Sequence, residues 1–186
     1  MRRVRSLAVP LVLAAVVLPG APAGSSAAAV CESSLPINID AGALETFALG
    51  LLQQSQTFRQ QCQRLAAVIV LRVQVRLVPS RSGSRAETTI RRFDTGALRA
   101  DIQLSFGEDY AELLAHEFEH VLEQVDRVSL VKQVETGQAW LTERGAYETA
   151  RAIQTGARAR HESELSAAEA VEANGRAVPR QRHPFQ

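Results

Sequence analysis

Along residues 40–106 the spacing of apolar side chains changes from a helical period to a strand period, so the fold must combine helices with a sheet. From Asp40 to Leu65 apolar residues recur every three to four positions, which predicts one long amphipathic helix with Asp40 as its N-cap. Residues 68–78 alternate between apolar and polar, as a strand with one wet face does. Residues 86–93 and 97–106 predict two more strands. The expected class is α+β, with a small antiparallel sheet of about three strands after the N-terminal helix.

A second helical pattern begins after Gly107 and carries the residues HEFEH at positions 116–120. Its apolar positions form a broad stripe, made of Tyr110, Leu113, Leu114, Phe118, Val121, Leu122 and Val125. At about 100° per residue, His116 and His120 lie side by side on the flank of this stripe, with Glu117 nearer its middle. We therefore expect these three side chains to face the protein body or a cleft.

Helical sequence resumes near residue 139 and predicts one or two C-terminal helices, followed by an extended basic tail over residues 176–186. A chain of 186 residues is too short to argue for two full domains. We expect a leader over residues 1–29 and one domain over residues 30–175. The net charge of +1 and the 5% aromatic content give no indication of nucleic-acid binding.

The N-terminus has the pattern of a cleaved signal peptide, with a basic start, an apolar stretch over residues 7–18 and small residues after it. The apolar stretch contains Pro10 and is shorter than the roughly 20 residues that span a bilayer. We therefore expect a secreted or periplasmic protein without stable membrane insertion. Lipoprotein anchoring at Cys31 is an alternative, which the bulky Val30 disfavours.

Cys31 and Cys62 are the two cysteines of the chain. In an oxidising compartment, two cysteines about 30 residues apart predict one disulfide. The alternative is that Cys62 is a buried thiol, because it continues the apolar stripe of the first helix.

The HEFEH segment has the residue types of a catalytic zinc site. Histidines one helical turn apart can supply two metal ligands, and a glutamate directly after the first can take a proton from a metal-activated water. Alternatively, His116 and His120 could be surface residues that pair with Glu119 and Glu123 at helical spacing. A purely structural metal site would not need a base at Glu117.

With this motif on a helix after a strand, the sequence resembles the zincin metallopeptidases, specifically a minimal gluzincin-like core over about residues 40–160. The resemblance implies that His116 and His120 bind zinc, that Glu117 is the general base, and that strand 97–106 is the cleft edge where an extended peptide adds. No glycine and third histidine follow at the metzincin spacing, so the third ligand would be a downstream carboxylate.

Two carboxylates compete for this third position. In one unbroken helix over residues 139–158, Glu143 would lie on the buried face and Glu148 would face solvent. Gly145 can end the first helical piece and Thr149 can cap a second, which would leave Glu148 at a helix entry. We choose Glu148, with Glu143 as the alternative; either could instead pair with a neighbouring arginine at helical spacing.

The function expected from these features is that of a secreted zinc-dependent metallopeptidase, a hydrolase that acts on a peptide or protein substrate with Zn²⁺ as cofactor. Tyr147 and His161 are candidates for stabilising the transition state. The alternative is a catalytically silent, disulfide-stapled binding or structural domain with a vestigial or non-catalytic metal site.

Overall fold

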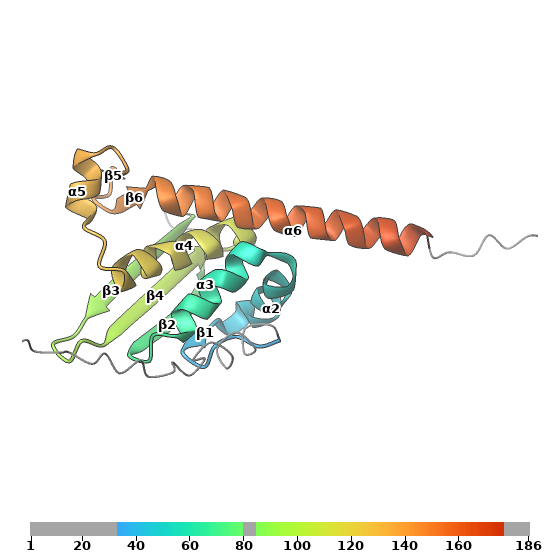
Figure 1. Ribbon diagram of the computed structural model, residues 1–186, viewed down its shortest axis with the longest axis horizontal. Coiled ribbons are helices and arrows are strands. Elements are labelled where there is room, and N and C mark those ends of the chain that lie inside the picture. The colour runs from blue at the N-terminus through green and yellow to red at the C-terminus, as the bar shows by residue number, and fades with distance from the viewer. Residues whose placement is uncertain (1–32, 80–84, 177–186) are drawn as a thin grey trace, which may run out of the picture.

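The computed structural model of the protein describes residues 33–79 and 85–176 (Figure 1). The predicted leader, Cys31 and nearly all of the predicted tail lie outside these ranges. In chain order the elements are β1 (Ile39–Asp40), η1 (Gly42–Leu44), α2 (Glu45–Gln54), α3 (Gln56–Ala66), β2 (Leu71–Val78), β3 (Ala86–Arg92), β4 (Leu98–Ser105), α4 (Tyr110–Val125), α5 (Leu130–Glu135), β5 (Ala139–Leu141), β6 (Tyr147–Thr149) and α6 (Ala150–Arg176). The class is α+β, as expected.

The main sheet has the strand order β1-β2-β4-β3 and is mixed. β3 pairs antiparallel with β4, whereas β4 runs parallel to β2, with Val73 opposite Ala100. The expectation of a wholly antiparallel sheet was therefore wrong. An alternating pattern shows which face of a strand is buried, but side chains alternate in the same way in parallel and antiparallel strands.

The long helix expected over residues 40–65 is divided into η1, α2 and α3, and Asp40 lies in β1. The division falls at Ser55, which has extended backbone angles and caps α3, because its hydroxyl accepts the Phe58 backbone N–H at 3.0 Å. Glu162 of α6 stabilises this start, since its carboxylate accepts hydrogen bonds from the Ser55 hydroxyl and the Thr57 backbone N–H. The residue that stabilises the start of α3 thus lies more than 100 residues away in the sequence.

Helices α2, α3 and α4 lie against one face of the main sheet, and α6 runs along α4 and extends beyond it (Figure 1). The inner positions of β2 and β4 are buried, among them Val73, Val75, Ala100 and Ile102. They form one core with the apolar stripe of α4. Within the described ranges, none of the helices has the length and apolar character that a membrane crossing requires.

Residues 139–149 form a hairpin, not the start of a helix as predicted. Gly145 has a φ of +75°, and its backbone N–H donates to the Thr142 carbonyl at 2.9 Å, which closes the turn between β5 and β6. A single helix, α6, follows from Ala150. The hairpin and α5 form a small lobe beside the start of α6 (Figure 1).

Candidate metal centre

α4 begins where Asp109 caps it, since this carboxylate accepts the backbone N–H groups of Ala111 and Glu112 at 3.1 and 3.2 Å. The helix presents His116 and His120 one turn apart on its flank, both partly buried. Glu117 is 5% exposed on the face toward the sheet. These placements agree with the prediction from the helical period.

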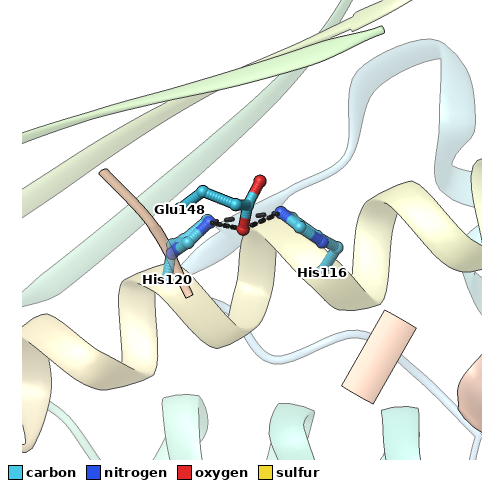
Figure 2. Close-up of side chains that lie close together, drawn as sticks. All are labelled: His116, His120 and Glu148. Carbon is cyan, nitrogen blue, oxygen red and sulfur yellow. Dashed lines mark hydrogen bonds and ion pairs between the residues drawn. The ribbon is translucent and has the colours of Figure 1, made fainter. Parts of the chain in front are cut away.

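The hairpin strand β6 brings Glu148 against the two histidines, as Figure 2 shows. Glu148 Oε1 lies 3.2 Å from His116 Nε2 and 3.5 Å from His120 Nε2, and the two Nε2 atoms lie 3.2 Å apart. Ligand atoms that surround a tetrahedral Zn²⁺ at 2.0–2.1 Å are separated from one another by about 3.3–3.4 Å. The three atoms thus have the mutual spacing of three corners of such a site, and one corner is left for a water.

Glu123 fixes the orientation of the His120 ring. Its carboxylate lies 3.0 Å from His120 Nδ1, and the residue is 1% exposed. A carboxylate at this position favours a proton on Nδ1, so the lone pair of Nε2 is available to a metal. This is the carboxylate–histidine arrangement that usually supports a metal ligand.

Glu148 is held in place by its neighbour Thr149. The Thr149 backbone N–H donates to Glu148 Oε1 at 2.8 Å, and the Thr149 hydroxyl donates to Glu123 Oε1 at 2.7 Å. The same hydroxyl accepts the Ala152 backbone N–H at 3.0 Å and so caps α6, as the sequence predicted for Thr149. One buried threonine therefore links the third candidate ligand, the support of His120 and the start of α6.

Two further contacts hold α6 against α4. Arg151 forms an ion pair with Glu119, which is buried and also accepts a hydrogen bond from Gln61 at 2.7 Å. Gly156 allows the helices to approach closely, because a Cβ there would lie 2.7 Å from the Glu112 carbonyl oxygen and 3.1 Å from His116 Cβ. The alternative prediction, that the histidines are surface residues paired with Glu119 and Glu123, is therefore not what the structure shows. Glu123 does pair with His120, but Glu123 is buried, and Glu119 pairs with Arg151.

The charges of the site are coupled. Burial lowers the pKa of His120, but its hydrogen bonds to Glu123 and Glu148 outweigh burial and raise the pKa to about 10. Burial also opposes ionisation of Glu148, yet hydrogen bonds from both histidines bring its pKa well below the usual range. These contacts favour a proton on His120 beside an ionised Glu148, and a metal ion bound by the same groups would replace that proton.

Glu117 lies beside this triad and has a different environment. Burial raises the pKa of its carboxyl group, and the neighbouring histidines and Thr88 offset burial only in part. The Thr88 hydroxyl of β3 donates to Glu117 Oε2 at 2.5 Å. A carboxylate with a raised pKa is better suited to accept a proton than an ordinary surface glutamate.

The triad and Glu117 open into a cleft of about 960 Å³ between β3, α4 and the β5–β6 turn. β3 is at the end of the strand order, and β4 is in the interior of the sheet. The prediction that strand 97–106 forms the cleft edge was therefore wrong. Position in a sheet depends on pairing partners, which a strand's own alternation does not reveal.

The other site residues predicted from the sequence lie partly in the cleft and partly away from it. Tyr147 and Glu143 both line the cleft, but only Glu148 of the two glutamates joins the triad. His161 is exposed on α6 and is not among the residues that line the cleft. Cys62 is buried in α3, and its predicted partner Cys31 lies outside the described residues.

Sequence reasoning missed Thr88 and Thr149 as contacts of the site, and it considered Glu123 only as a surface partner of His120. The i, i+3 spacing of His120 and Glu123 was a usable signal for their contact. No local pattern could have paired Thr88 with Glu117, which lies 29 residues further along the chain.

None of the protein-family models, curated proteins or solved structures compared with the chain matches it. The function of the protein must therefore be inferred from the chemistry and geometry of the site.

Proposed function

We propose that the protein is a zinc-dependent metallopeptidase that hydrolyses peptide bonds in an extended substrate. The observation that carries this proposal is the arrangement of His116, His120 and Glu148, with three ligand atoms 3.2–3.5 Å apart and Glu117 one residue from the first histidine. Two neutral donors and one carboxylate are a common ligand set of catalytic zinc.

In the proposed site the two Nε2 atoms and Glu148 Oε1 hold the ion. When bound, zinc supplies a Lewis acid that polarises the substrate carbonyl and brings the pKa of a water toward neutrality. Glu117 accepts the proton from the attacking water and passes it to the leaving amine. Its burial supports this role, because the raised pKa makes the carboxylate a stronger base and its conjugate acid a group that can still donate.

The substrate side of the proposal is supported by β3. It stands at the end of the strand order among the described residues, and Glu87, Thr88 and Ile90 line the cleft. An extended peptide can add to such an edge through backbone hydrogen bonds, and its carbonyl groups would then lie next to the metal site. Tyr147, which also lines the cleft, is the candidate for a hydrogen bond to the developing oxyanion.

We also propose that the protein acts after export, on the strength of the signal-peptide pattern over residues 1–29. In that compartment a zinc peptidase would meet unfolded and extracellular proteins.

The test is hydrolysis of an unstructured protein, such as casein, by zinc-loaded protein and by its Glu117→Gln variant. Cleavage by the parent, loss of cleavage in the variant and equal zinc content in both would support the proposal. A parent that binds zinc but cleaves neither casein nor a mixed peptide library would instead favour the silent metal-binding domain.

A further inference from the structure

Thr88 lies on the edge strand β3, and its side chain is on the face of the sheet that packs against α4. Its hydroxyl points toward Glu117. Along β3 the side chains alternate, so Thr88, opposite Ile102, lies on the inner face of the sheet, and the exposed Thr89 lies on the outer face. The Thr88 hydroxyl donates to Glu117 Oε2 at 2.5 Å. This distance is that of a charge-assisted hydrogen bond to a carboxylate, which is about twice as strong as a neutral one.

The contact distinguishes the two carboxylate oxygens of Glu117 by their hydrogen bonding. Oε2 accepts the Thr88 hydroxyl, and none of the hydrogen bonds found among the described residues goes to Oε1. A glutamate has three side-chain torsions, so a carboxylate without a fixed contact would sample several orientations toward the metal site. The Thr88 bond selects one orientation and leaves Oε1 for the proton of the attacking water.

We infer that Thr88 is a positioning residue for the general base, holding Glu117 by one oxygen so that the other is aimed at the reacting water. This inference rests on the proposed peptidase function. Because Thr88 lies on β3, which lines the cleft, it also links the surface on which a peptide would dock to the group that takes the proton.

The test compares three variants. Thr88→Val has nearly the same shape and removes the hydroxyl, Thr88→Ser keeps the hydroxyl, and Thr89→Val makes the same change on the outer face of β3. Zinc content, thermal midpoint, kcat and KM are measured for each. In Thr88→Val we expect full zinc content and a kcat lowered roughly 10- to 100-fold, the range usual for the loss of a supporting hydrogen bond in a metal site. KM should change little, because the hydroxyl is engaged by Glu117 and its loss removes no group offered to the substrate.

Thr88→Ser should restore most of kcat, and Thr89→Val should behave as the parent. Equal kcat in Thr88→Val and the parent would overturn the inference. So would a loss of zinc or of folding in Thr88→Val that Thr88→Ser shares, because the residue would then act on the scaffold and not on the base.

A second measurement does not need a substrate. In protein labelled with ¹³C at the glutamate carboxyl carbon, the Glu117 signal is identified by its absence in Glu117→Gln. We expect this signal to shift and broaden in Thr88→Val and to stay at the parent position in Thr88→Ser and Thr89→Val. If the parent cleaves no peptide, the proposed function fails, and this spectrum alone decides whether Thr88 orients Glu117. An unchanged Glu117 signal in Thr88→Val would reject the orienting contact.

Discussion

Glu123 on α4 accepts a 2.7 Å hydrogen bond from the hydroxyl of Thr149, which follows Glu148 at the end of β6. The other oxygen of the same carboxylate lies 3.0 Å from His120 Nδ1. One buried carboxylate therefore sets the position of two candidate ligands that come from different elements. These contacts hold the candidate ligands together within the protein itself, which would reduce the entropy that metal binding has to overcome.

Replacing this carboxylate should weaken metal binding. Glu123→Gln keeps the shape of the side chain but removes the charge that orients His120, so zinc affinity should fall roughly 10- to 100-fold. Glu143→Gln is the matched control, because Glu143 lines the same cleft without joining the triad. Competition with a chromogenic chelator measures both. Equal affinity in Glu123→Gln and Glu143→Gln would show that the buried hydrogen bonds do not support the ligands.

Replacing the base should separate binding from chemistry. Glu117→Gln removes the proton acceptor but no ligand atom, so zinc content should equal that of the parent while kcat/KM falls roughly 10²- to 10⁴-fold. Steady-state hydrolysis of a fluorogenic peptide and metal analysis of the same samples check this. Undiminished cleavage by the variant would mean that another group takes the proton.

The closeness of α4 and α6 predicts opposite effects of two glycine substitutions. In Gly156→Ala the new Cβ would lie 2.7 Å from the Glu112 carbonyl oxygen, so the helices must separate. Such overpacking typically costs about 1–3 kcal/mol, and part of it is offset by the better helix propensity of alanine.

Gly50 in α2 is the control, since a Cβ there meets nothing within 4 Å. Gly50→Ala should raise stability by about 0.5–1 kcal/mol. Thermal or urea unfolding of the two variants distinguishes them. A Gly156→Ala variant as stable as Gly50→Ala would show that α6 does not depend on this close approach.

The contact between Glu162 and the start of α3 predicts a pH-dependent contribution to stability. Burial would raise the pKa of Glu162, but hydrogen bonds from the Thr57 backbone and the Ser55 and Thr57 hydroxyls lower it. A carboxyl whose pKa is lowered by folding stabilises the protein at neutral pH and loses this effect as the pH falls through the lowered pKa.

Glu162→Ala should therefore cost about 1 kcal/mol at neutral pH, as the loss of a helix cap does, and much less near pH 3. Glu164→Ala is the control, because the Glu164 side chain is 62% exposed and, within the part of the chain that the structure describes, its ion pair is with Arg160. Urea unfolding at both pH values measures the difference. A cost for Glu162→Ala that is the same at pH 7 and pH 3 would contradict the assigned contact.

Some parts of this fold follow from local patterns and others do not. The predicted strands 86–93 and 97–106 agree closely with β3 (Ala86–Arg92) and β4 (Leu98–Ser105), because alternation is a property of each strand alone. The parallel pairing of β2 with β4 and the edge position of β3 depend on which strands meet. The start of α3 at Ser55 is stabilised by Glu162, a partner more than 100 residues away, which no local pattern reveals.

In the candidate site, too, some residues could be predicted from local patterns and others could not. His116, Glu117 and His120 lie on one helix, so a helical period was enough to predict their common side. Glu148 was preferred because Gly145 could interrupt a helix and Thr149 could cap one. Gly145 does interrupt the chain, though in a hairpin turn, and Thr149 does cap α6. Thr88 could not be predicted, because its contact requires β3 to be placed beside α4.

The measurement that tests the central claim most directly is the zinc content per chain of protein purified without added metal and then equilibrated with a small excess of zinc. We predict one tightly bound zinc per chain in the parent, in His161→Ala and in Glu143→Gln, because neither residue belongs to the triad. His116→Ala, His120→Ala and Glu148→Gln should each lose it, since three protein ligands are the usual number for catalytic zinc. A parent that stays free of zinc, or triad variants that keep full zinc content, would contradict the proposed metal centre.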